Sequence, residues 1–310
     1  MEIFNQDSGK TEAVKEEKSP RSFFPRRDMN DLLPLWEKLV FFFADFLGLN
    51  IISIFVSLLV IAFGRFSIET AGSDPLANSL VNFFSYLIIF VIYMLMIFLI
   101  KRKTYKPLFK GFADKKIYLY ALGGLLAIFA VEQLLGLLYQ KTVPFYSSNE
   151  NQTTIVKMMQ SYPALVFFPT VLFAPFVEEL AYRVGLVDTI GHKDKNTWLG
   201  IILASIIFGL IHTSLTSITD YLTISASSEA SAAAIESAYQ TMVNEFLNLP
   251  IYLIDGFIMA FVYVKSGKIA ASITLHVSNN LLSFIILLAQ SLSATSGNST
   301  SLLNMWVHFL

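Results

Sequence analysis

Two adjacent glutamates and an arginine lie inside a strongly apolar stretch of the sequence, in the segment FVEELAYR at positions 176–183. A charged side chain at the centre of a membrane span costs roughly 2.5–3.5 kcal/mol, so such residues are retained mainly for function or for pairing. On a helix, residues four apart share a face, so Glu179 can pair with Arg183, whereas Glu178 points about 100° away. We expect Glu179 and Arg183 to neutralise each other and Glu178 to remain available as a general base. A purely structural alternative is a buried ion pair beside a spare acid that faces a pocket of water.

Two histidines lie in other apolar stretches, each with a partner four residues away. His212 follows Phe208, and His276 precedes Asn280, so the members of each pair share one face of a helix. An isolated histidine in a membrane span is often no more than an interhelical hydrogen bond. Here polar clusters occur on three separate apolar stretches, which favours a common site.

The composition sets the class of protein. Of 310 residues, 55% are hydrophobic and 15% are charged, a balance that predicts a multi-pass membrane protein and not a soluble domain. Cysteine is absent, which excludes thiol catalysis, disulfides and thiolate metal sites. Any metal would have to be held by His, Glu, Asp or Asn.

Seven apolar runs are long enough to cross a hydrocarbon core of about 30 Å, which takes roughly 20 helical residues. They cover residues 39–64, 78–100, 117–139, 162–189, 198–216, 246–264 and 268–290. The predicted fold class is therefore all-α, a polytopic transmembrane helical bundle of about seven spans. A last apolar piece, 302–310, is too short to cross.

Basic residues indicate the orientation, because Lys and Arg are retained in short cytoplasmic loops. Four segments on one side of the bundle hold 18 of the 22 Lys and Arg residues: 1–38, 101–116, 191–197 and 265–268. The connections on the other side hold three. We therefore predict a cytoplasmic N-terminus and a multi-pass location in the cell membrane. The longest external connection, 217–245, is expected to carry a surface helix over about 228–245.

Depth within the membrane supports a shared site. Counted from the cytoplasmic end of each span at about 1.5 Å per residue, Glu178 lies roughly 17 Å deep and Asn280 roughly 18 Å. By the same count, His212 lies roughly 21 Å deep and His276 roughly 12 Å. The four residues are therefore predicted to share one layer, somewhat on the cytoplasmic side of the membrane.

Three motifs carry a family resemblance: EExxxR from Glu178, FxxxH from Phe208 and HxxxN from His276. In this order and on separate spans, they resemble the motifs of the CPBP intramembrane proteases. That family includes the type 2 CAAX prenyl endopeptidases (Rce1-like) and the bacterial Abi and bacteriocin-immunity proteins. The resemblance covers about 160–290, and the first three spans resemble nothing specific.

The resemblance implies roles for individual residues. Glu178 and His212 would activate the attacking water, while His276 and Asn280 would hold the oxyanion or a ligand position. Supporting roles are implied for three further residues: Glu179, Arg183 and Phe208. Peptide hydrolysis needs an activated water, a proton donor for the leaving amine and donors for the oxyanion, and these residue types can supply all three.

The need for a metal is left open by the residues. Glu178, His212 and His276 could hold Zn²⁺ with an open water position, or Glu178 and His212 could polarise the water unaided. We expect no tightly bound metal. Two competing protease patterns, HExxH and GxSxG, are absent from the sequence.

Four regions are predicted along the chain. They are a disordered polar cytoplasmic tail (1–38), N-terminal transmembrane spans (39–139), a CPBP-like catalytic transmembrane core (160–290) and an external tail (291–310). The predicted function is that of an intramembrane endopeptidase, a hydrolase of glutamate or metallo type, that cleaves a membrane-associated peptide or leader in the cytoplasmic half of the bilayer. The expected partners are membrane lipid and a peptide or protein with a membrane-proximal cleavage site, with no nucleic acid.

Two other functions compete with this prediction. The main alternative is a non-enzymatic immunity or scaffold protein that keeps the motif for packing. A proton-coupled carrier is disfavoured because no inverted repeat is visible. For the remaining span acids, Asp45, Glu132 and Asp255, interhelical hydrogen bonding is the default, although Gly256 gives Asp255 the stronger functional case by allowing close approach.

Overall fold

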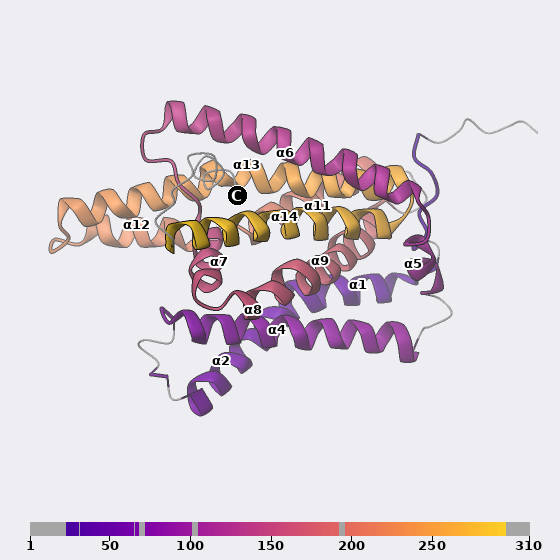
Figure 1. Cartoon of the computed structure of the whole chain (residues 1–310), viewed down its shortest axis with the longest axis horizontal. Coiled ribbons are helices and arrows are strands. Elements are labelled where there is room, and N and C mark those ends of the chain that lie inside the picture. The colour runs from indigo at the N-terminus through magenta and orange to yellow at the C-terminus, as the bar shows by residue number, and fades with distance from the viewer. Residues whose placement is uncertain are drawn as a thin grey trace, which may run out of the picture.

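The computed structural model describes residues 23–30, 32–64, 66–67, 72–100, 105–191 and 196–295, and every regular element within them is helical (Figure 1). Six helical segments are long and apolar enough to cross a membrane: Leu35–Gly64, Pro75–Leu99, Lys116–Thr142, Pro163–Ile190, Ala232–Ser266 and Ile269–Ser291. A seventh is a pair of helices, Thr197–Ile211 and Thr216–Ala226, bent by 44°. The prediction of an all-α transmembrane bundle with about seven spans is confirmed.

The first half of the chain supplies the outer spans. The first span consists of α1 (Leu35–Phe43), the π-helical segment η1 (Ala44–Leu49) and α2 (Asn50–Gly64). The following elements are α4 (Pro75–Leu95), η2 (Met96–Ile100), α5 (Lys106–Gly111), α6 (Lys116–Thr142) and α7 (Glu150–Ser161). The last of these, α7, is a short helix that the sequence did not predict.

The second half supplies the centre of the bundle. The fourth span runs through α8 (Pro163–Phe167), η3 (Phe168–Phe173), α9 (Ala174–Glu178), η4 (Glu179–Val187) and α10 (Asp188–Ile190). It is followed by α11 (Thr197–Ile211), α12 (Thr216–Ala226), α13 (Ala232–Ser266) and α14 (Ile269–Thr295). In the most apolar 18-residue stretch of each span, 56% of the residues are buried in the fourth span and 11% in the first. The fourth span can therefore carry charges, because neighbouring helices shield it from lipid.

Two sequence signals set helix ends. The Asp74 carboxylate accepts the backbone N–H groups of Leu76 (2.7 Å) and Ala77 (3.0 Å) at the start of α4. At the other end of the bundle, α13 stops at Gly267, whose φ of 70° lies in the left-handed region. A Cβ at position 267 would also lie 2.8 Å from the carbonyl oxygen of Arg26, so the turn between α13 and α14 needs glycine for two reasons.

A segment before α1 packs into the bundle, whereas the sequence predicted a disordered tail up to residue 38. Phe24, Met29 and Leu33 are buried, and so is Lys38, which donates to the backbone carbonyl of Asn30 at 2.6 Å. The local composition is polar and mixed in charge, so the burial of these apolar side chains by other helices is invisible in the sequence around them. Residues 1–22 lie outside the described part of the chain, as do 302–310.

Arg27 anchors this segment to the fourth span. Its Nε lies 2.6 Å from Asp188 Oδ1, and its terminal nitrogen donates to the carbonyl of Gly191 at 2.7 Å. The other oxygen of Asp188 accepts the Tyr263 hydroxyl at 2.6 Å. Both charged side chains are fully buried, so loss of either one would leave the other without this ion pair.

A helical hairpin extends from the opposite end of the bundle. The predicted surface helix over about 228–245 is not separate: α13 begins after Ser231, which caps it, and continues for 35 residues through Pro250. Together with α12, the first part of α13 projects beyond the other helices (Figure 1). This continuity was not predicted because Pro250 and the polar residues before it are typical of a break between a surface helix and a span.

Replacing Arg27 by alanine should destabilise the protein strongly. The change leaves Asp188 buried without its counter-charge, and breaking such a pair typically costs about 3–5 kcal/mol. Arg26→Ala is the matched control, because its side chain is exposed. The melting temperatures of the two variants in detergent test the prediction, which fails if both match the parent protein.

Candidate active site

The two glutamates lie where the fourth span changes its helical pitch. Glu178 ends α9 and Glu179 begins the π-helical segment η4. Wide helical turns of this kind are rare and occur often at functional sites. Glu179 is fully buried and Glu178 is 5% exposed, so only Glu178 retains contact with open space.

Glu179 is neutralised within the protein, as the sequence predicted. Its Oε2 lies 3.0 Å from Arg183 Nε, in an ion pair between side chains that are both fully buried. The same oxygen accepts a short hydrogen bond from the Ser272 hydroxyl, and Oε1 lies 3.0 Å from His276 Nδ1. Arg183 in turn lies over the ring of Phe208, 5.1 Å from its centroid. The predicted pairing of Glu179 with Arg183 is confirmed.

Glu178 has weaker partners. Its Oε1 accepts the Tyr86 hydroxyl at 3.2 Å, and its Oε2 lies 3.8 Å from His276 Nε2. The buried carboxyl group of Asp45 also interacts electrostatically with Glu178. Among the described residues, no Lys or Arg forms an ion pair with Glu178. Its carboxylate therefore keeps the capacity to take a proton from a bound water.

His276 connects the two glutamates. Because the Glu179 carboxylate accepts from Nδ1, this nitrogen carries the proton, and Nε2 faces Glu178. The sequence placed His276 beside Asn280 alone. The contacts show that its ring is also held by the neutralised acid, which fixes its orientation next to the available one.

His212 reaches the site from the end of α11. Its Nδ1 donates to the carbonyl of Phe208 at 2.7 Å, which leaves Nε2 free of the helix. The imidazole stacks on Tyr252, with ring centroids 5.0 Å apart. The centroid of the Phe208 ring lies 4.5 Å from that of His212 and 6.0 Å from that of His276, so Phe208 packs against both imidazoles.

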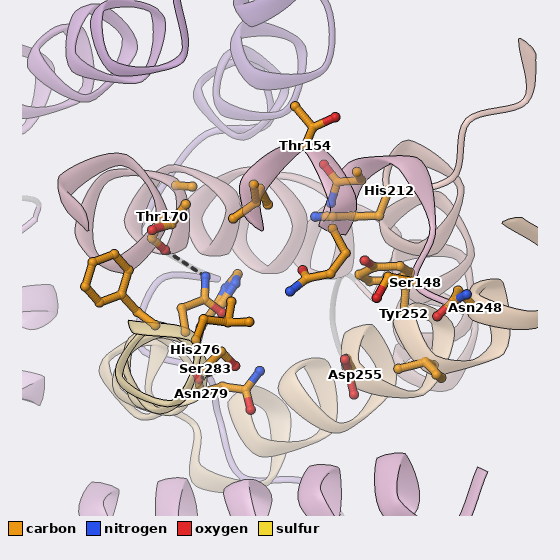
Figure 2. Close-up of a pocket in the computed structure, with 18 of the residues that line it drawn as sticks. Ser148, Thr154, Thr170, His212, Asn248, Tyr252, Asp255, His276, Asn279 and Ser283 are labelled. Carbon is orange, nitrogen blue, oxygen red and sulfur yellow. Dashed lines mark hydrogen bonds between the residues drawn. The ribbon is translucent and has the colours of Figure 1, made fainter. Parts of the chain in front are cut away.

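Asn280 is fixed by a carbonyl that the fourth span leaves free. At the end of η3, the Ala174 N–H donates to the carbonyl oxygen of Pro169, five residues earlier. The next carbonyl, that of Thr170, would accept from residue 175 in the same pattern, but Pro175 has no N–H. The carbonyl of Thr170 is thus available, and Asn280 Nδ2 donates to it at 2.8 Å (Figure 2). One amide hydrogen of Asn280 remains for another acceptor.

One cavity of about 290 Å³ is lined by all four residues predicted to be catalytic: Glu178, His212, His276 and Asn280. Figure 2 shows the cavity between His276, Asn279 and Ser283 on one side and His212, Tyr252 and Asn248 on the other. It extends to Thr154 on α7, whose side chain is exposed. The cavity therefore reaches the protein surface beside α7.

The ring nitrogens and carboxylates that could hold a metal have the following partners. The described part of the chain holds no group of three His, Asp or Glu side chains placed to share one ion. His212 Nδ1 is occupied by the Phe208 carbonyl, and His276 Nδ1 by Glu179. The Nε2 atoms of both rings remain available to a water or an ion. The expectation that no metal is tightly bound stays a prediction.

Sequence reasoning missed or undervalued several residues around Glu178. Tyr86 lies on α4, in a region with no recognisable motif, and only its contact with Glu178 identifies it. Asp45 and Asp255 were assigned to interhelical hydrogen bonding, yet each has a buried carboxyl oxygen with no hydrogen-bond partner among the described residues. Charge inside an apolar run was the signal available for both acids. The expected close approach at Gly256 is present, since a Cβ there would lie 3.2 Å from Ser205 Cα.

Comparison with known proteins agrees with this geometry. Residues 160–282 match the family model described as type II CAAX prenyl endopeptidase Rce1-like. This segment is similar to the Rce1-like endopeptidases. The predicted resemblance to the CPBP intramembrane proteases is confirmed. The matched residues contain all three motifs, and the match ends two residues after Asn280.

One curated relative accompanies the Rce1-like match. The chain is 28% identical over 172 residues to the UPF0177 protein YvdC of Lactococcus lactis subsp. lactis (strain IL1403), an alignment that covers 54% of this chain and 61% of that protein. The chain thus spans less than two thirds of the relative's length. No solved structure gave a significant match.

The two glutamates of the Rce1-like segment should differ in their effect on stability. Glu179→Ala leaves Arg183 buried without its counter-charge, at a cost of about 3–5 kcal/mol. Glu178→Ala removes a carboxylate that no cation neutralises, so it should leave the melting temperature nearly unchanged. A Glu179→Ala/Arg183→Ala double variant should lose less stability than the two single losses added together. A melting temperature lower in Glu178→Ala than in Glu179→Ala would reverse the assignment.

Proposed function

We propose that the protein is an intramembrane endopeptidase of the CAAX-protease-like type, acting on a membrane-associated peptide or leader. The observation that supports this most strongly is the single cavity in which a free glutamate, two histidines and an asparagine meet from three separate spans. The Rce1-like match implies a protease. Multi-pass insertion follows from the apolar helices, and the cell membrane is the location that we propose.

In the proposed reaction, Glu178 acts as the general base. A water held by Glu178 and oriented by His212 Nε2 attacks the carbonyl carbon of the peptide bond, and its proton passes to the Glu178 carboxylate. The electron pair of the C=O bond moves onto oxygen. The Tyr86 hydroxyl donates to Oε1 of Glu178, while His276 Nε2 lies 3.8 Å from Oε2.

The oxyanion is stabilised by donors that the fold has already fixed. Asn280 is oriented by the carbonyl of Thr170, lines the cavity and has a second amide N–H to donate. Such preorganised donors contribute about 10²–10³-fold to a rate. Collapse of the intermediate breaks the C–N bond, and the proton on Glu178 passes to the leaving nitrogen. The products are a carboxylic acid and an amine, so the atoms balance.

Peptide cleavage tests the proposal directly. Purified protein in detergent, incubated with a library of synthetic membrane-proximal peptides, should yield fragments that mass spectrometry identifies. Glu178→Ala should lower the rate by about 10²–10⁴-fold, because it removes the base. Asp220→Asn, on the projecting α12, is exposed and serves as the control with full activity. Absence of fragments from a correctly folded parent protein would favour a non-enzymatic immunity or scaffold role.

The route to the site follows from the place where the cavity reaches the surface. Thr154 and α7 lie at the end of the bundle opposite α5 (Figure 1). With the basic loops in the cytoplasm, that end is external. We therefore propose that the substrate approaches beside α7, from the external side, and reaches a site that the depth count places somewhat on the cytoplasmic side of the membrane.

Single cysteines in this cysteine-free chain test the orientation. Thr154→Cys should react with a membrane-impermeant maleimide on intact cells, and a bulky label there should slow cleavage by obstructing the cavity. Lys106→Cys, on α5 at the other end, is the matched control and should react only after permeabilisation. The reverse pattern of labelling would place the cavity mouth in the cytoplasm.

A further inference from the structure

The cavity contains a second cluster of charge that the proposed reaction does not use. Glu132 projects from α6 and Asp255 from α13, and both line the cavity together with Glu178. Figure 2 shows Asp255 directed into the space between the His212 side and the His276 side. The helices that carry Glu132 and Asp255 pack against each other, and the two carboxyl groups interact electrostatically.

These acids have no counter-charge in the described part of the chain. No Lys or Arg is among the described residues that line the cavity, and neither acid forms an ion pair with one. Asp255 is only 7% exposed, and its Oδ1 has no hydrogen-bond partner. An unpaired carboxylate in such a place is costly unless a cation or a donor arrives to satisfy it.

The surrounding side chains suit a cation. Tyr146 and Tyr252 also line the cavity and interact electrostatically with Glu132 and Asp255, respectively. Aromatic rings attract ammonium and guanidinium groups. Asn248 also lines the cavity, and its amide oxygen accepts from the Tyr146 hydroxyl at 3.4 Å. Carboxylates, aromatic rings and amide oxygens together make a site for a positively charged side chain with several N–H donors.

The position of the cluster relates it to the reacting bond. Tyr252 stacks on His212 at 5.0 Å, and Asp255 lies three residues further along α13, about 4.5 Å along the helix axis. An extended peptide advances about 3.3 Å per residue. A residue bound at the acids would therefore lie within a few positions of the bond held between Glu178 and His212.

We propose that Glu132 and Asp255 form a subsite that binds a Lys or Arg side chain of the substrate close to the cleaved bond. This inference rests on the proposed function and specifies its substrate class: peptides with a basic residue near the cleavage site. The ion pairs form beside a carboxylate that is only 7% exposed, where they are stronger than on a surface. The subsite thereby selects basic peptides against neutral ones of the same shape.

Peptide capture tests the subsite separately from catalysis. Glu178→Ala protein in detergent is incubated with an N-acetylated library of random synthetic peptides, in which Lys and Arg are the only cations, and bound peptides are identified by mass spectrometry. Lys and Arg should be enriched about tenfold or more among the captured peptides. Adding Glu132→Gln and Asp255→Asn should abolish the enrichment, while adding Asp220→Asn instead should leave it intact. Asp255→Asn alone serves if the fuller variant melts at a lower temperature.

The same library, incubated with protein that retains Glu178, separates the two hypotheses. Cleavage with Lys or Arg at one fixed distance from the cut, lost in the Glu132→Gln/Asp255→Asn variant, supports both. Cleavage or capture without a basic preference, or with a preference that survives loss of the two acids, overturns the subsite and leaves the peptidase function standing. Acid-dependent capture without any cleavage by the parent protein supports the subsite and overturns the peptidase function.

Discussion

The site depends on the complete neutralisation of one buried carboxylate. Glu179 is surrounded by Arg183, Ser272 and His276, and together these groups satisfy a charge that the bilayer interior would otherwise penalise by several kcal/mol. The arrangement also orders the chemistry next to it. Because His276 is tied to Glu179 through one ring nitrogen, the other is directed at Glu178. An ion pair that serves the fold therefore determines the geometry of the acid available for catalysis.

Irregular backbone places the other reactive groups. The fourth span is not a uniform α-helix, and two of its five pieces are π-helical. Pro175 leaves the Thr170 carbonyl without its helical partner, and Asn280 on α14 takes that place. A regular span would have used this carbonyl internally. The cost of an interrupted hydrogen-bond ladder is thus offset by an interhelical contact that orients a side chain in the cavity.

The sequence predicted those features that depend on local pattern. Apolar length predicted the spans, and the spacing of four residues predicted the Glu179–Arg183 pair. Similar depth predicted that Glu178, His212, His276 and Asn280 lie together, and all four line one cavity. The roles of these four residues as catalysts stay a prediction.

Features that depend on contacts between distant segments were not predictable. The burial of Arg27 depends on Asp188, which is 161 positions away, and the hydrogen bond from Tyr86 to Glu178 joins residues 92 apart. No periodicity or spacing in one segment encodes such a partner. The extension of α13 was missed for a different reason: Pro250 is a helix breaker by intrinsic preference, yet the helix continues through it.

The long α13 has a mechanical consequence. Glu245, near the projecting hairpin, accepts the backbone N–H groups of Glu150 (2.7 Å) and Ser214 (2.7 Å), and so ties α7 and the end of α11 to the same helix that carries Asp255. Glu245 and Asp255 are ten residues apart, or about 15 Å along the axis. The hairpin and the cavity wall are thus joined by one continuous helix, in which Pro250 removes a backbone hydrogen bond. A force applied to the hairpin outside the bundle would be transmitted along α13 to the wall of a cavity buried in the membrane.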